Sequence, residues 1–271
     1  MKHKLPFFVV LLATLAFARG ADAQSFSYTY QGKTLNYTIT YGNAELTGFT
    51  WSFDNTLDGT VAIPDSVEYQ SVKYPVKSIA AHAFEYGYDM DTLVIPNTVL
   101  SIGDNAFQCC KGLVEVTFGN SLSSIGALAF EQDTLLVSLN LPASVTSIGA
   151  NAFRGCKGLT SISVAASNTV YDSRNGCNAI IQTNTNMLVL GCVNTVIPST
   201  VTSIGENAFS YQKSLQATTI PNSVVSLGNS AFAHCDSLAS IVIPNSVTQI
   251  GNYCFTDCPL LSSVTLGDSI A

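Results

Sequence analysis

Hydrophobic side chains recur along the chain in a block that reads IGxNAF with small changes. An isoleucine or leucine opens each block and a phenylalanine follows five positions later, which gives the pairs Ile79–Phe84, Ile102–Phe107, Ile125–Phe130, Ile148–Phe153, Ile204–Phe209, Leu227–Phe232 and Ile250–Phe255. Successive blocks lie 23 positions apart, except that the step from Ile148 to Ile204 is 56 positions, or 23 plus 33. A fixed period of this length predicts a stack of coils that share one core.

Each repeat is expected to contain two short strands and one helical turn. Segments such as Val145 to Ile148 alternate apolar and polar residues, as a strand with one buried face does. The glycine of the block predicts a sharp corner, and the Asn-Ala-Phe part a single helical turn that places phenylalanine in the core. Downstream, Leu113 to Phe118 has apolar side chains at its first, fourth and sixth positions and predicts a second strand.

Two regions depart from the repeat. Residues 24–61 alternate Phe26-Ser27-Tyr28-Thr29-Tyr30 before a turn at 31–33, which predicts a β-rich cap ahead of a repeat region at 62–271. The longer step is explained by a hairpin at about 165–197, with strands at 178–182 and 187–190 about the polar turn 183–186. A register symmetric about that turn places Cys177 opposite Cys192, where a disulfide is possible.

Residues 1–23 are typical of a signal peptide. Lys2 and Lys4 precede an apolar run from Phe7 to Phe17, and small residues at 21–23 predict cleavage before Gln24. The apolar run is too short to span a bilayer. We therefore expect an exported chain that is secreted or held at the cell surface, with the periplasm as an alternative.

The charge balance excludes several partners. Removing Lys2, Lys4, Arg19 and Asp22 from the 11 basic and 18 acidic residues leaves 8 and 17, a net charge of −9. Such a balance repels phosphate groups, so we expect neither nucleic acid nor an anionic membrane surface as a partner. No stretch after the signal peptide is apolar enough to span a bilayer, so no membrane insertion is expected. Charged residues make up 11% of the chain and hydrophobic ones 47%, which excludes disorder and predicts a surface rich in Ser, Thr and Asn.

Half of the eight cysteines share one repeat position, three after the phenylalanine: Cys110, Cys156, Cys235 and Cys258. A cysteine that recurs in this way is typical of a small buried apolar side chain, which is the interpretation we favour. Two of them, Cys235 and Cys258, lie in adjacent coils, where strand spacing would also allow a disulfide. No zinc-type spacing is present, and no metal or cofactor is expected.

The histidines argue against an enzyme. His3 falls in the predicted signal peptide, while His82 and His234 lie about six coils apart, roughly 29 Å at ~4.8 Å per coil. They cannot share a general acid–base site with each other. Paired carboxylates do not converge at any repeated position, and no glycine-rich phosphate loop or nucleophile elbow appears in the sequence. We predict no catalytic residue and no enzymatic activity.

The outward positions of the second strand form rows, which we call the candidate binding face. Most of its side chains are small and polar, and its members are Glu115, Thr117, Ser138, Asn140, Ser161, Ser163, Ala217, Thr219, Ser240, Val242, Ser263 and Thr265. One interpretation is the β-propensity of a solvated sheet. The other is a surface that docks a protein or a glycan, because repeat proteins use extended faces for binding.

The blocks IGDNAFQCCKGL, IGANAFRGCKGLTSI and IPNSVTQIGNYCF resemble the BspA-like leucine-rich repeat family, and VYDSRNGCN at 170–178 looks like the longer repeat found inside such proteins. The resemblance implies a β-rich solenoid of the α/β leucine-rich repeat type, coiled right-handed, with two short parallel strands and one helical turn per repeat. It also implies an exported or cell-surface protein of a host-associated organism, and adhesion to host matrix proteins or to neighbouring cells. The family has no shared catalytic residues.

Three functions follow as hypotheses. The first is an exported, non-enzymatic scaffold that binds an extracellular protein of a host matrix or neighbouring cell. The second is a structural spacer within a longer multidomain surface protein, and the third is glycan binding through the Ser/Thr rows. The chain ends at Ala271, short of the next expected block, as in a fragment of a longer array or a protein with an exposed last coil.

Overall fold

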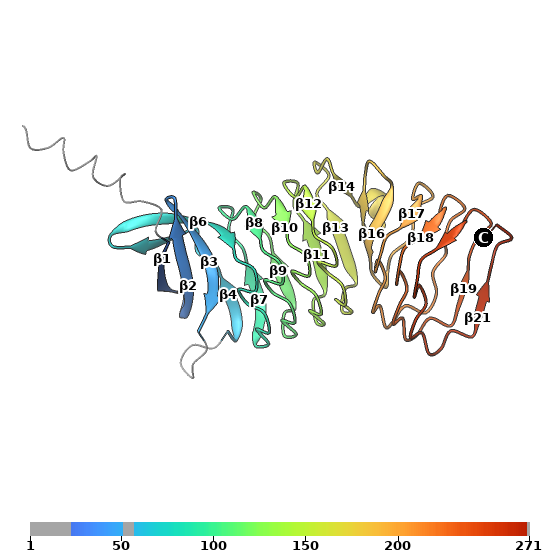
Figure 1. The fold of residues 1–271 in the computed structure, drawn as a ribbon, viewed down its shortest axis with the longest axis horizontal. Coiled ribbons are helices and arrows are strands. Elements are labelled where there is room, and N and C mark those ends of the chain that lie inside the picture. The colour runs from blue at the N-terminus through green and yellow to red at the C-terminus, as the bar shows by residue number, and fades with distance from the viewer. Residues whose placement is uncertain (1–22, 51–56, 270–271) are drawn as a thin grey trace, which may run out of the picture.

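The protein is described by a computed structural model that covers residues 23–50 and 57–269. Repeats succeed one another along the long axis of the molecule, from the β1–β3 end to the β19–β21 end (Figure 1). The signal peptide predicted for residues 1–23 lies, apart from its last residue, outside the described residues.

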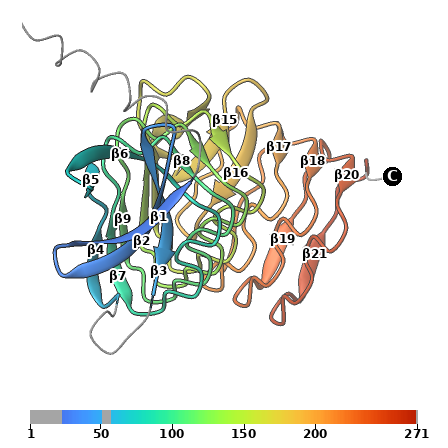
Figure 2. The ribbon, with the colours of Figure 1, turned by 60° about the vertical axis from the view of Figure 1, so that its left-hand side comes forward.

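The N-terminal segment is an antiparallel meander. Its strands are β1 (Gln24–Tyr30), β2 (Lys33–Thr40) and β3 (Asn43–Phe49). The predicted turn at 31–33 is present, and Gln31 and Gly32 have φ of 48° and 79°, the backbone that a two-residue hairpin turn requires. Strand β3 pairs in parallel with β6 (Val72–Ile79), which itself pairs with β5 (Ser66–Tyr69). The meander therefore covers the edge of the first repeat (Figure 2).

The first strand of each repeat is short, and the strands of neighbouring repeats pair in parallel. One series continues from β6 through β8 (Ser101–Ile102), β10 (Ser124–Ile125) and β12 (Ser147–Ile148). A second series contains β17 (Ser203–Ile204), β18 (Ser226–Leu227) and β20 (Gln249–Ile250). Within both series each isoleucine or leucine pairs with its equivalent in the next repeat, as the spacing predicts.

The second strands form three separate sheets. The first contains β4 (Gly59–Ala62), β7 (Met90–Val94) and β9 (Glu115–Thr117). The others pair β11 (Ser138–Leu141) with β13 (Ser161–Val164), and β19 (Ser240–Val242) with β21 (Ser263–Thr265). In β9, β11 and β19 the buried and exposed residues alternate, so one face of each strand packs on the core.

The longer repeat contains the predicted hairpin. Its elements are β14 (Tyr171–Asp172), a 3-10 turn η1 (Arg174–Gly176), β15 (Ala179–Gln182) and β16 (Met187–Gly191). Strands β15 and β16 pair antiparallel, and Met187 and Leu188 of β16 then pair in parallel with Ser203 and Ile204. The hairpin therefore takes the place of one first strand at the start of the second series.

The predicted helical turn is wrong, because no α-helix occurs in the described part of the chain. Two residues with positive φ flank each phenylalanine instead. The position two before it is held by His82, Asn105, Leu128, Asn151, Asn207, Ser230 and Tyr253, with φ between 51° and 60°. The position two after it is held by Tyr86, Cys109, Gln132, Gly155, Tyr211, His234 and Asp257, with φ between 50° and 77°.

These alternating conformations direct backbone N–H groups along the stack. The Phe84 N–H donates to Ala106 O at 2.7 Å and the Phe107 N–H to Ala129 O at 2.8 Å, and the residues two before and two after these two phenylalanines donate in the same way. A helical turn would aim these groups at its own carbonyls. We call this series of bonds the turn ladder; each bond joins a turn to the equivalent turn of the next repeat.

The phenylalanine rings stack beneath the turn ladder. Centroids lie 5.2, 5.1 and 5.4 Å apart along Phe84, Phe107, Phe130 and Phe153, with interplanar angles of 7° to 13°. A second stack joins Phe209, Phe232 and Phe255 at 5.0 and 5.7 Å. The sequence predicts one unbroken stack, and this is wrong. The core divides into two clusters that meet at the longer repeat.

The glycine of the block is needed for close packing between repeats. A Cβ at Gly103 would lie 2.4 Å from Ala81 N, and one at Gly149 would lie 2.3 Å from Ala127 N. Neither residue has positive φ, so glycine is required here because a side chain would clash, and the positive-φ backbone belongs to the residues around the phenylalanine. Gly205 is less crowded, since its nearest neighbour would be Leu188 O at 2.9 Å.

The number of stacked neighbours of each phenylalanine ring predicts how much stability its replacement by alanine removes. Phe107 has a stacked ring on both faces, so Phe107→Ala should lower the free energy of unfolding by about 3–5 kcal/mol. Among described residues Phe153 stacks only on Phe130, so Phe153→Ala should cost less. Urea denaturation followed by circular dichroism measures both. A loss at Phe153 equal to that at Phe107 would contradict the stacking argument.

Candidate functional site

The candidate binding face is exposed and built from paired residues. Ser138 pairs with Ser161 and Asn140 with Ser163, and the Ser163 hydroxyl donates to Asn140 Oδ1 at 2.7 Å. At the far end, Ser240 pairs with Ser263 and Val242 with Thr265. Equivalent side chains of adjacent repeats therefore stand side by side, about 4.8 Å apart, as neighbours across a parallel pair do.

The face is not one continuous sheet. Glu115 and Thr117 of β9 pair with β7, while Ala217 and Thr219 are exposed but lie outside any strand. The longer repeat separates β13 from the segment that carries Ala217. All twelve predicted residues are exposed except Ser138, which is half-buried. The structure brings them together as short rows on successive repeats.

The recurring cysteines lie beneath the turns as hydrogen-bond donors, three of them buried and Cys258 half-buried. Cys110 Sγ donates to Phe84 O at 3.2 Å, Cys156 Sγ to Phe130 O at 3.0 Å, and Cys235 and Cys258 repeat the contact with Phe209 and Phe232. Burial raises the pKa of Cys110 and Cys156 well above the usual value, and that of Cys235 to about 12. A thiol held neutral in this way is a poor nucleophile, in agreement with a structural role.

The eight cysteines are free thiols, and the disulfide predicted between Cys177 and Cys192 does not form. A bulge between Ile180 and Ile181 shifts the hairpin register, so that Ala179 pairs with Gly191. Extending that register places Asn178 opposite Cys192, because one extra residue turns the next side chains to the other face. The Cys235–Cys258 alternative is not formed either, since each thiol binds a different carbonyl.

The histidines have separate neighbours. His82 Nδ1 lies 2.7 Å from Glu85 Oε2, and His234 Nδ1 lies 3.4 Å from Asp257 Oδ2 while its ring stacks on Tyr211. No group of three His, Cys, Asp or Glu side chains suited to a metal occurs within residues 23–50 and 57–269.

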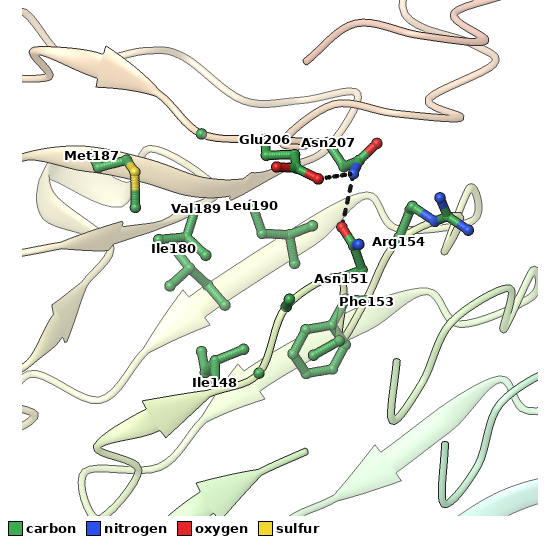
Figure 3. Close-up of a pocket in the computed structure, with 14 residues that line it drawn as sticks. Ile148, Asn151, Phe153, Arg154, Ile180, Met187, Val189, Leu190, Glu206 and Asn207 are labelled. Atoms are coloured by element: carbon green, nitrogen blue, oxygen red, sulfur yellow. Dashed lines mark hydrogen bonds between the residues drawn. The ribbon is translucent and has the colours of Figure 1, made fainter. Parts of the chain in front are cut away.

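Sequence reasoning missed a cavity between the two stacks, which we call the interruption pocket (Figure 3). It encloses about 220 Å³, and its apolar lining includes Ile148, Phe153, Ile180, Met187, Val189 and Leu190. Its polar rim includes Asn151, Arg154, Glu206 and Asn207. Asn207 Nδ2 donates to Asn151 Oδ1 at 2.8 Å across the rim, and Figure 3 shows these two side chains facing each other.

The Arg154 side chain at the rim is paired with a carboxylate of the preceding repeat. Arg154 Nε donates to Glu131 Oε1 at 2.8 Å, and the same buried carboxylate accepts from Gln108 of the preceding repeat. Glu206 on the opposite wall is exposed. The Arg154 guanidinium is thus paired with Glu131 of the preceding repeat. The pocket itself is lined mainly by uncharged groups.

Comparison with known proteins agrees with this architecture. The model of the BspA type leucine-rich repeat region, with six copies, matches residues 77–186 and 179–271. The chain therefore belongs to the BspA-type leucine-rich repeat family. Leucine-rich repeat proteins are protein-binding scaffolds, which makes protein interaction the general expectation for this chain. No curated protein matches the chain by sequence.

Solved structures share the fold at low identity. A leucine-rich repeat protein from Eubacterium ventriosum is 23% identical with a TM-score of 0.58, over 90% of this chain and 72% of that one. One from Bacteroides ovatus is 22% identical with a TM-score of 0.53, over 90% and 78%. The pneumococcal vaccine antigen PcpA is 15% identical with a TM-score of 0.56, over 90% and 82%. The β-rich repeat fold is thus that of bacterial leucine-rich repeat proteins.

Within the described ranges, no helix is long and apolar enough to cross a bilayer.

Asp133 occupies the cysteine position in one repeat and gives a test by pH. Its side chain is fully buried, and neither oxygen has a hydrogen-bond partner among the described residues. Burial raises the pKa of this carboxyl well above its usual 3.8. Between the usual and the raised pKa the unfolded chain releases a proton that the folded chain retains, so the free energy of unfolding should fall as pH rises.

Asp133→Asn should remove this pH dependence and raise the free energy of unfolding near pH 7 by about 1 kcal/mol or more. Urea denaturation at several values between about pH 4 and pH 7 measures it. Asp91→Asn, at an exposed position, is the matched control. Parallel stability curves for the Asp133 variant and the unmodified protein would contradict the assignment.

Proposed function

We propose that this chain is an exported, non-enzymatic scaffold, wound as a right-handed solenoid, that binds an extracellular protein through the candidate binding face. The partner belongs to a host extracellular matrix or to the surface of a neighbouring cell. The observation that supports this is the in-register pairing of exposed side chains on successive repeats. Family membership supports the protein-interaction part.

The chemistry of the face suits a broad, flat contact. Small side chains such as Ser and Thr lose little conformational entropy when a partner orders them. Glu115 is the one charged member, so contact depends on shape and hydrogen bonding more than on charge. Because most of the side chains are carried by strands that pack on the core, those parts of the face are also pre-organised, which lowers the cost of binding.

Lysine substitutions test the face. Ser161→Lys with Ser163→Lys places two long cations in the middle of the rows, so binding to immobilised extracellular-matrix proteins should weaken at least tenfold, as judged by surface plasmon resonance. The matched control is Thr146→Lys with Thr248→Lys, which adds the same charge at exposed positions directly before β12 and β20.

The proposal is supported if the unmodified protein binds saturably, the Ser161→Lys/Ser163→Lys variant binds at least tenfold more weakly, and the control variant binds as the unmodified protein does. A glycan array probed with the same proteins supplies the opposing result. Binding to glycans alone, with none to any matrix or cell-surface protein, would reject protein adhesion in favour of glycan recognition.

A further inference from the structure

The interruption pocket lies where the turn ladder lacks a partner. At the other junctions between successive repeats, three alternate N–H groups of one turn donate to carbonyls of the next, as Leu128, Phe130 and Gln132 do to Ala150, Ala152 and Arg154. The equivalent donors of the following turn are the N–H groups of Asn151, Phe153 and Gly155. No acceptor for these three groups is present among the described residues.

The opposite wall is only partly covered by the hairpin. Gly191 N–H donates to Ala208 O at 2.8 Å, and the Gly191 backbone packs so closely on Phe209 that a Cβ would lie 2.2 Å from its ring. Gly191 thus covers the Phe209 ring that a missing phenylalanine would otherwise contact. Among the described residues no ring stacks on the other face of Phe153, whose side chain is 4% exposed and lines the pocket (Figure 3).

The space that remains matches one aromatic side chain. An apolar cavity of about 150 Å³ holds a benzene molecule, and the interruption pocket encloses about 220 Å³. Its lining includes aliphatic and aromatic side chains, and two of the three donors belong to residues that line it, Asn151 and Phe153, with Gly155 two residues further along the same turn. A free aromatic molecule would fill the cavity but leave these N–H donors unpaired. A peptide with an aromatic side chain would fill the cavity and also supply carbonyl acceptors for the donors.

We propose that the interruption pocket binds a polypeptide segment that carries a phenylalanine side chain. The ring enters the cavity against Phe153, while carbonyls at alternate residues of the segment accept the N–H groups of Asn151, Phe153 and Gly155. The segment takes the place of the absent turn, so its sequence should resemble the Ala-Phe turns that neighbouring repeats of this chain place at the other junctions. Binding displaces the Asn151–Asn207 hydrogen bond, which closes the rim in the unbound protein.

This site is separate from the candidate binding face, so either can fail without the other. The probe is a fluorescein-labelled peptide of residues 101–108, SIGDNAFQ, added to the purified protein and followed by fluorescence anisotropy. We expect saturable binding that weakens at least tenfold when alanine replaces phenylalanine in the peptide, since a buried ring contributes that much or more. Absence of saturable binding at millimolar protein would overturn the proposal.

A variant that fills the pocket tests the location. Val189→Phe adds a ring to the lining and should abolish peptide binding, whereas Val225→Phe, at an exposed position outside the pocket, should leave it unchanged. Equal binding by both variants would place the peptide elsewhere and overturn the assignment.

Amide hydrogen exchange on the unmodified protein gives a result that does not depend on how a variant folds. Without peptide, the Phe153 amide should exchange at least tenfold faster than the Phe130 amide, which donates to Ala152 O at 2.7 Å. Saturating peptide should slow exchange at Phe153 and leave Phe130 unchanged. A Phe153 amide whose exchange does not respond to bound peptide would show that the donors are not used.

Discussion

The structure depends on the backbone hydrogen bonds of the turn ladder, which join each turn to the equivalent turn of the next repeat. These bonds fix the distance between repeats, and the phenylalanine rings beneath them stack at centroid distances of 5.2 and 5.1 Å around Phe107. The glycines permit this approach, because a side chain there would overlap the backbone of the preceding repeat. One repeat cannot satisfy its own turn, so stability arises between repeats.

The same register determines what the surface can do. Where it is intact, equivalent side chains line up on successive repeats and produce the rows of the candidate binding face. Where the longer repeat interrupts it, the core divides, one wall of the junction retains unpaired donors, and a cavity opens beside Phe153. Regular repetition thus supplies a broad contact surface, and the single interruption supplies a specific pocket.

The regular period was enough to predict the repeat fold and the stacking of neighbouring rings, though not the division into two stacks. The hairpin was predicted from its own alternating strands and polar turn. The turn was predicted as helical, although asparagine tolerates positive φ and holds this position in three repeats. Leu128 and Tyr253 also adopt positive φ there, which no local preference of leucine or tyrosine indicates. The pairing of Cys177 with Cys192 was expected from a hairpin register symmetric about the turn. The bulge between Ile180 and Ile181 shifts that register, and the sequence does not indicate the bulge. The pocket could not be predicted, since it results from a missing turn.

Deleting part of the chain tests the register most directly. Removal of 103–125 joins Ile102 to Gly126, so one whole repeat is lost and all remaining ladder partners are kept. The account predicts a folded protein with the circular dichroism spectrum and cooperative urea unfolding of its parent. Removal of 103–123 instead leaves one coil with two extra residues, so the ladder should break at that junction and the protein should be less stable. Equal stability of the two deletions, or unfolding of the 103–125 deletion, would contradict it.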